Sequence, residues 1–126
     1  MTVAVLTSEL MTRSRIAAAA ERLEIAAEFA SAEGALVELV RERGARLVIL
    51  DLEQPGLQPA ELMKALRAGG ASGLQVVAFG PHVHEARLQA AAAAGCDRVL
   101  ARGKFYAELD AVLQDGQAAA PTREES

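Results

Sequence analysis

The sequence is poor in cysteine and in aromatic residues, and it has no long basic or apolar run. Of its 126 residues one is cysteine and 3% are aromatic, and the formal net charge is −4. The single cysteine, Cys96, cannot form an internal disulfide, which excludes a secreted disulfide framework. Without clustered lysine and arginine the chain lacks the usual surface for nucleic-acid phosphates, so we expect no direct nucleic-acid binding.

The sequence also shows no segment typical of a signal peptide or of a membrane span. Residues 1–6 have no basic stretch and no long apolar run, and they are typical of a strand rather than a signal peptide. The alanine run at 90–94 is too short and too weakly apolar to cross a bilayer. We therefore expect a soluble, cytoplasmic protein with no membrane contact.

What the chain has is apolar residues in a regular order. They make up 52% of the sequence, enough for the core of one domain. Five short apolar runs alternate with amphipathic stretches, which predicts a parallel sheet with right-handed crossovers. The strands are expected at 3–6, 25–30, 46–51, 74–79 and 98–100. We expect one domain at 1–115 and a disordered tail at 116–126.

The helices are expected between these strands. The first spans about 9–23, the second follows an N-cap at Ser31 and ends at Gly44, and the third begins near Pro59. The fourth spans 83–94, before Gly95. A fifth and last helix is marked by apolar residues at i, i+4, i+7 and i+8, namely Phe105, Leu109, Val112 and Leu113.

The core and the ligand edge follow from this order. The continuous run at 46–51 is typical of a central strand covered on both faces. We expect almost complete burial of five strand residues, which are Val5, Val48, Leu50, Val77 and Leu100. Parallel sheets bind ligands at the carboxyl ends of their strands. The candidate site residues are therefore those that directly follow each strand.

Two of these segments carry a family resemblance. In Leu-Asp-Leu-Glu-Gln-Pro-Gly at 50–56, a strand ends in Asp51, and Pro-Gly follows four and five residues later. In Ala-Gly-Cys-Asp-Arg-Val-Leu at 94–100, a Gly turn leads into the last strand. Over about residues 2–115 the chain resembles the receiver domain of two-component response regulators (CheY-like). The fold implied is α/β and flavodoxin-like, with a five-stranded parallel sheet in the order 2-1-3-4-5 and helices on both faces.

The resemblance also implies a phosphorylation site, from which this sequence departs. In active receivers an acidic pair after the first strand holds Mg²⁺, and the Asp after the third strand accepts the phosphoryl group. A Thr or Ser after the fourth strand and a Lys after the fifth bind the phosphoryl oxygens. Here Thr7 and Ser8 stand at the acidic pair, and Glu9 is acidic one position late.

The phosphoryl-binding positions depart as well. Gly80 stands at the Thr/Ser position, Arg102 at the Lys position, and Gly103 replaces the usual proline. Val99 stands where receivers carry an aromatic switch residue. Only Asp51 remains at its place. We expect it to be a structural or inherited carboxylate that caps a loop or pairs with Arg102, and we expect Arg102 to point toward it.

We therefore predict no catalytic residue, no metal site and no cofactor. Mg²⁺ would enter only in an alternative, rearranged pocket that uses Asp51 with Glu9 and a carbonyl near Glu53. Such a ligand set is poor for an ion that demands octahedral oxygen coordination. The predicted pocket around the phosphoacceptor-position residue Asp51 consists of Thr7, Ser8, Glu9, Glu53, Gly80, Arg102 and Lys104.

The histidines, the cysteine and Lys104 each have an ordinary structural role as the alternative to a functional one. His82 and His84 have the spacing of a zinc pair but lack an evident third ligand, so exposed loop histidines are favoured. Cys96 is expected to be a small buried apolar residue without a histidine partner. Lys104 either substitutes for the missing lysine or is an ordinary residue of the last helix, which we favour.

The leading functional hypothesis is a stand-alone pseudo-receiver that acts by protein–protein interaction. The partner would be a protein such as a histidine kinase or an effector, and the face of the fourth helix, fifth strand and fifth helix would be the docking or homodimer surface. One alternative is a phosphoacceptor response regulator of a phosphorelay with a rearranged pocket. Another, from a different class, is a flavodoxin-like small-ligand binder or enzyme.

Overall fold

The computed structural model describes residues 2–69 and 73–117 as five strands and six helices around one sheet. The strands are β1 (Thr2–Leu6), β2 (Ala26–Ala30), β3 (Leu47–Asp51), β4 (Gln75–Gly80) and β5 (Arg98–Ala101). The helices are α1 (Leu10–Arg22), α2 (Glu33–Arg43), α3 (Pro59–Gly69), α4 (Glu85–Ala93), α5 (Arg102–Ala107) and α6 (Leu109–Gln117).

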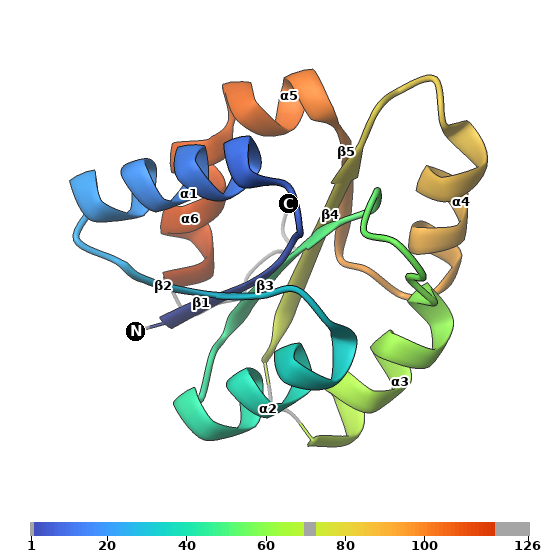
Figure 1. Ribbon diagram of the computed structural model, residues 1–126, viewed down its shortest axis with the longest axis horizontal. Coiled ribbons are helices and arrows are strands. Elements are labelled where there is room, and N and C mark those ends of the chain that lie inside the picture. The colour runs from blue at the N-terminus through green and yellow to red at the C-terminus, as the bar shows by residue number, and fades with distance from the viewer. Residues whose placement is uncertain (1, 70–72, 118–126) are drawn as a thin grey trace.

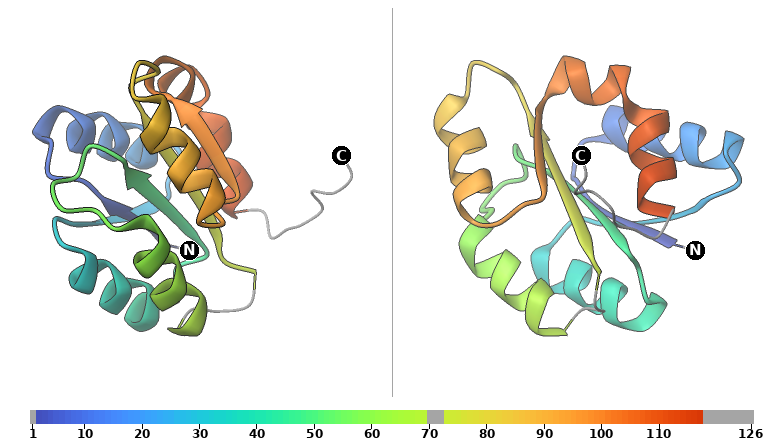
Figure 2. Two further views of the ribbon diagram at one scale, coloured as in Figure 1. Left: turned by 90° about the vertical axis from the view of Figure 1, so that its right-hand side faces the viewer. Right: turned by 180° about the vertical axis from the view of Figure 1, so that it is seen from behind.

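The sheet is parallel throughout, in the predicted order β2-β1-β3-β4-β5. Figure 1 shows α1, α5 and α6 on one side of it and α2, α3 and α4 on the other. The views in Figure 2 show the same two layers from the side and from behind. The predicted fold class is therefore confirmed, with one helix more than expected.

Alternation along the strands explains why both faces are apolar. Val48 and Leu50 of β3 join a cluster with α2, α3 and α4, whereas Leu47 and Ile49 join a second cluster with α1, α5 and α6. Successive side chains point to opposite faces, so a strand covered twice is a continuous apolar run. The burial predicted for Val5, Val48, Leu50, Val77 and Leu100 is confirmed.

The additional helix arises from a break at Glu108, between α5 and α6. Its N–H donates to the carbonyls of both Lys104 and Phe105, at 3.0 and 3.2 Å, and its carboxylate pairs with Arg98 at 2.8 Å. The apolar residues on either side of the break remain on one face, as expected. The apolar spacing was therefore correct, but it gave no sign of the interruption, because the break preserves the buried stripe.

Turn residues were predicted with mixed success. Gly44 ends α2 with a φ of 64°, Gly95 follows α4 with a φ of 102°, and Pro59 is the first residue of α3, as expected. The N-cap expected at Ser31 is wrong: α2 is capped by Ala32, without a side-chain hydrogen bond. The carbonyl of Ser31 instead accepts a hydrogen bond from the side chain of Gln54, at 2.8 Å.

Other boundaries differ by a few residues. The fourth helix begins at Glu85 rather than at residue 83. Part of the expected tail at 116–126 belongs to α6, which extends to Gln117, and the remainder lies outside the described residues. Across the described ranges, none of the helices combines the length and the apolar character that a membrane span requires.

Candidate functional site at the carboxyl edge of the sheet

Asp51 is the last residue of β3 and lies at the carboxyl edge of the sheet. It is only 2% exposed. Its Oδ2 accepts a hydrogen bond from the hydroxyl of Thr7 at 2.7 Å, and its Oδ1 accepts one from the backbone N–H of Glu53 at 3.0 Å. Both carboxylate oxygens are therefore bound by neutral donors from neighbouring loops.

Thr7 completes a short network after β1. Its hydroxyl oxygen also accepts a hydrogen bond from the N–H of Glu9, at 3.1 Å, while its proton goes to Asp51. The side chain that stands at the position of a metal-binding carboxylate is thus a buried structural link between two loops. This arrangement joins the end of β1 to the end of β3.

Glu9 is directed to its own helix. It is the N-cap of α1, and its Oε1 accepts hydrogen bonds from the N–H of Thr12 at 2.8 Å and from the Thr12 hydroxyl at 2.5 Å. These hydrogen bonds, with smaller contributions from the N–H of Met11 and the charge of Arg102, hold the pKa of the Glu9 carboxyl below its usual value. Capping the helix N-terminus accounts for a glutamate one position late.

Arg102 does not pair with Asp51, so that prediction is wrong. Its guanidinium donates to Oε1 of Glu53 at 3.2 Å and lies 5.7 Å from the centre of the Phe79 ring. The oxygens of Asp51 are already occupied by Thr7 and by the Glu53 N–H. Glu53 is partly solvated, so pairing a long arginine with it requires less desolvation than burial beside Asp51.

Two other side chains, those of His84 and Arg87, also lie close to Glu53. Its Oε2 lies 3.5 Å from Nδ1 of His84 and 3.9 Å from Nη1 of Arg87. All four side chains in this group are between 31% and 54% exposed. Each pair is therefore weak on its own, but together they join the loop after β3 to α4 and α5.

Gln54 is a site residue that the sequence pattern did not identify. It is buried; its Oε1 accepts from the hydroxyl of Ser8 at 3.0 Å, and its Nε2 donates to the carbonyl of Ser31 at 2.8 Å. One amide thus links the loops after β1, β2 and β3. The only sequence signal was a polar residue between Asp51 and the Pro-Gly, which does not reveal burial.

The remaining predicted pocket residues, Lys104 and Gly80, contribute no side-chain group to the hydrogen bonds around Asp51, and neither does Val99 at the switch position. Lys104 is in the first turn of α5 and pairs with Glu108 at 3.4 Å, as an ordinary helical residue would. A Cβ at Gly80 would lie 3.3 Å from Cβ of Leu52, so a hydroxyl-bearing residue would crowd that side chain. Val99 is partly buried against the cluster on the side of α2, α3 and α4.

In the described part of the chain, the two histidines belong to no metal-binding group and the cysteine has no activated thiol. His82 is exposed, and these ranges hold no group of three or more His, Cys, Asp or Glu residues placed to hold a metal ion. Cys96 is half-buried, with its Sγ 3.8 Å from Sδ of Met63. Burial, with a smaller effect of Asp97, raises the pKa of the Cys96 thiol to about 11 despite the opposing charge of Arg67.

A cavity of about 250 Å³ opens beside Asp51, lined by Ser8, Glu9, Asp51 and residues 53–55. The donor set around it does not fit the magnesium ion that receiver domains hold. Thr7 and Ser8 are neutral, Glu9 is bound to Thr12, and Glu53 is paired with Arg102. Mg²⁺ needs several hard oxygen ligands in octahedral geometry, and two of the three carboxylates that line this cavity, those of Glu9 and Glu53, are held by other partners.

Comparison with known proteins gives a fold and no close relative. No protein-family model matches the sequence, and no curated protein matches it. A response regulator from Hahella chejuensis superposes with a TM-score of 0.80 at 22% identity, over 97% of this chain and 98% of that one. The receiver domain of a sensor histidine kinase from Pseudomonas aeruginosa PAO1, with magnesium coordinated in its active-site cleft, gives 0.78 at 17% identity, over 94% and 98%.

A third similar structure is a receiver in a complex. The receiver domain of the Saccharomyces cerevisiae response regulator Ssk1, crystallised with the histidine phosphotransfer protein Ypd1, gives a TM-score of 0.77 at 17% identity, over 94% of this chain and 92% of that one. These similarities cover nearly the whole of both chains, but their sequence identity is low. They establish that this chain has the fold of response-regulator receiver domains, as the Asp51 loop and the turn at Gly95 predicted.

Proposed function

We propose that this protein is a receiver-like signalling module that acts by protein–protein interaction and without phosphorylation of Asp51. The observation that carries the proposal is the state of Asp51. Its two oxygens are held by the Thr7 hydroxyl and the Glu53 N–H, at 2.7 and 3.0 Å, and the residues at the metal-binding positions are neutral.

The chemistry of phosphoryl transfer supports this proposal. A carboxylate that attacks a phosphoryl donor meets like-charge repulsion, which a metal ion and an ammonium group normally offset. Here Arg102 is engaged by Glu53, and Gly80 has no hydroxyl to donate. Each missing contact typically lowers the rate by about 10²–10³. The acidic metal ligands at positions 7 and 8, an unpaired cation at position 102 and the hydroxyl at position 80 are all missing, so the reaction should be too slow for a signal.

The function then rests on a partner. By analogy of fold, the face of α4, β5 and α5 is the docking or homodimer surface, and the partner is a cytoplasmic protein such as a histidine kinase or an effector. Two receivers of this fold provide the analogy: one was crystallised with a histidine phosphotransfer protein, and one, of NtrC4, is a dimer in its beryllofluoride-activated form. In this proposal the protein is not an enzyme.

One observation favours a second candidate, a phosphoacceptor with a rearranged pocket. Asp51 is 2% exposed, but it lines an open cavity of about 250 Å³, so in this candidate a small phosphoryl donor would approach the carboxylate from that cavity. In that case Mg²⁺ would have to bind with few acidic ligands, and Arg102 would have to leave Glu53.

Intact-mass spectrometry after incubation with acetyl phosphate and Mg²⁺ separates the two candidates. We expect no mass increase of one phosphoryl group, while a receiver that accepts phosphate from this donor is modified in a parallel reaction. A phosphoryl adduct that forms on the natural protein and is absent from Asp51→Asn would reject the first proposal and establish the second.

A further inference from the structure

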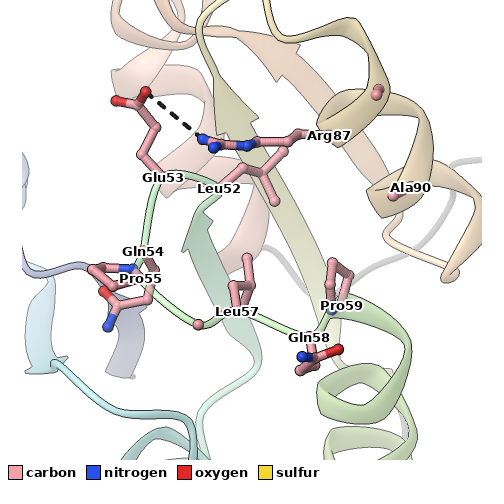
Figure 3. Close-up of a pocket in the computed structure, with 11 residues that line it drawn as sticks. Leu52, Glu53, Gln54, Pro55, Leu57, Gln58, Pro59, Arg87 and Ala90 are labelled. Atoms are coloured by element: carbon pink, nitrogen blue, oxygen red, sulfur yellow. Dashed lines mark ion pairs between the residues drawn. The ribbon is translucent and has the colours of Figure 1, made fainter.

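A second and larger cavity lies next to the Asp51 loop, between that loop and α4. Its volume is about 390 Å³, and it is lined by residues 52–59 together with Ala86, Arg87 and Ala90. Figure 3 shows Arg87 extending from α4 across one side of this cavity toward Glu53, with Leu57 and Pro59 on the opposite side. Cavities that hold small organic ligands begin at about this size.

The walls of the cavity are mainly apolar. Leu52 is buried in the core beneath it, and the partly buried Leu57 packs against the same cluster. On the side of α4, Ala86 and Ala90 contribute only methyl groups, and these short side chains leave the space open. An apolar lining with few polar groups is typical of a small-molecule site, in which the polar groups fix the orientation of the ligand.

Arg87 is the cationic group of this cavity, and its present contacts are long. Its Nη1 lies 3.9 Å from Oε2 of Glu53 and 3.5 Å from Nδ1 of His84, whereas hydrogen bonds between N–H and oxygen are usually about 2.7–3.2 Å. Glu53 has a closer partner in Arg102, at 3.2 Å. Arg87 can therefore bind another anion while Glu53 keeps a cation.

We infer that this cavity binds a small amphipathic monocarboxylate. Its apolar body lies between Leu52, Leu57 and Ala90, and its carboxylate accepts hydrogen bonds from Arg87. A planar guanidinium matches the two oxygens of a carboxylate, which makes arginine the natural recognition group. A single negative charge fits better than a doubly charged phosphate, because the carboxylate of Glu53 lies beside the guanidinium.

The inference does not depend on phosphorylation. The cavity is lined by Leu52, Glu53 and Gln54, which follow Asp51 directly. A ligand bound there would contact the same loop that holds the Asp51 oxygens. Binding would thus give the loop an input other than a phosphoryl group, and the failure of either proposal leaves the other standing.

The test is an NMR titration of the whole protein with octanoate up to about 10 mM, a range that detects weak binding. We expect saturable chemical-shift changes concentrated in residues 52–59 and 85–90. Octanamide, which has the same apolar body without the charge, should bind about tenfold more weakly or not at all. The absence of localised changes, or equal binding of octanamide, would overturn the inference.

Variants sharpen the assignment. Arg87→Gln should weaken octanoate binding by about tenfold or more. Arg22→Gln is the matched control, because Arg22 is similarly exposed and also paired with a carboxylate, that of Asp110, but on another surface. Ala90→Leu should abolish binding by filling the cavity at an exposed helical position. Octanoate affinity that is unchanged in Arg87→Gln or in Ala90→Leu would reject the site.

Discussion

Two aspartates lie at opposite edges of the sheet, and they differ in burial and in the charge of the groups that bind them. Asp51 ends β3 at the carboxyl edge, and Asp97 precedes β5 at the amino edge. Asp97 accepts hydrogen bonds from the N–H of Val76 at 2.7 Å and from Arg67 at 3.1 Å. Asp51 is bound by a hydroxyl and an N–H, and within the described ranges it belongs to no ion pair.

The difference separates a carboxylate that is paired with a cation from one that, among the described residues, is held by neutral donors alone. Asp97 and Arg67 are 32% and 41% exposed, and together they link the start of β5 to β4 and to the loop at Leu74. Asp51 is buried, and a buried charge without a cation is generally less favourable than a neutral group of the same shape. Stability therefore explains the negative charge at position 97 but not the one at position 51.

The largest effect is expected where a charge has neither a cation nor hydrogen-bond donors. Val48 is in the same strand as Asp51 and is 0% exposed within the apolar cluster. Val48→Asp should lower the free energy of unfolding by more than about 3 kcal/mol, measured by urea denaturation. Val83→Asp is the control, because Val83 is 72% exposed, and it should change stability by less than about 0.5 kcal/mol. A stable Val48→Asp variant would contradict the central position of β3.

A smaller loss is expected when the acceptor at position 97 is removed. Asp97→Ala leaves the N–H of Val76 and the guanidinium of Arg67 without their acceptor, and should cost about 1–3 kcal/mol in urea denaturation. Asp97→Asn keeps an acceptor for Val76 and loses only a partly exposed ion pair, so its cost should be about 1 kcal/mol or less. Equal losses in the two variants would show that the hydrogen bond to Val76 is unimportant.

These contrasts also mark how far the sequence could predict the structure. The strand order and the core followed from apolar runs, because alternation and burial on two faces depend on the local pattern. The left-handed turn at Gly44 was equally local, since it needs only a glycine after a helix. Structural features that depend on a single segment of the chain could therefore be predicted from the sequence.

The details of the site depended on competition between loops. Arg102 had more than one carboxylate to choose from, and the choice of Glu53 followed from the hydrogen bonds that already occupied Asp51. Gln54 is buried because two other loops supply its partners, Ser8 and the carbonyl of Ser31. No pattern within residues 50–56 contains that information.

The comparison also predicts a small effect of the opposite sign at the carboxyl edge. Asp51→Asn removes the buried charge, keeps an acceptor for the N–H of Glu53 and offers an amide donor to the Thr7 hydroxyl. We expect unchanged or higher stability, by up to about 1 kcal/mol. Asp51→Ala, which loses the acceptor, should instead cost about 1–3 kcal/mol. Equal destabilisation by the two substitutions would mean that the charge itself stabilises the fold.

The smallest expected effect uses Cys96 to sense the charge of Asp97. Burial is the main reason for a thiol pKa of about 11, Asp97 raises this pKa further, and Arg67 lowers it. Because the pKa in the folded state is raised, the folded protein favours the protonated thiol. That contribution to stability is complete below the pKa of an unfolded cysteine, about 8.5, and is lost as the pH rises toward 11.

The rate of alkylation of Cys96 by iodoacetamide reports the pKa of its thiol, because the thiolate is the reactive species. We expect slow alkylation at pH 8 and a rate that rises by about tenfold per pH unit up to pH 10, as expected for a thiol that is still mostly protonated. Asp97→Asn should raise the rate modestly, and Arg67→Gln should lower it, because these substitutions remove charges of opposite sign beside the sulfur. A thiol that titrates near pH 8.5 would contradict the burial of Cys96, and the same rate in both variants would contradict the proximity of Asp97 and Arg67 to its sulfur. The single cysteine of the chain lies at the amino edge, so the charge of Asp51 at the carboxyl edge is tested only through substitutions such as Asp51→Asn.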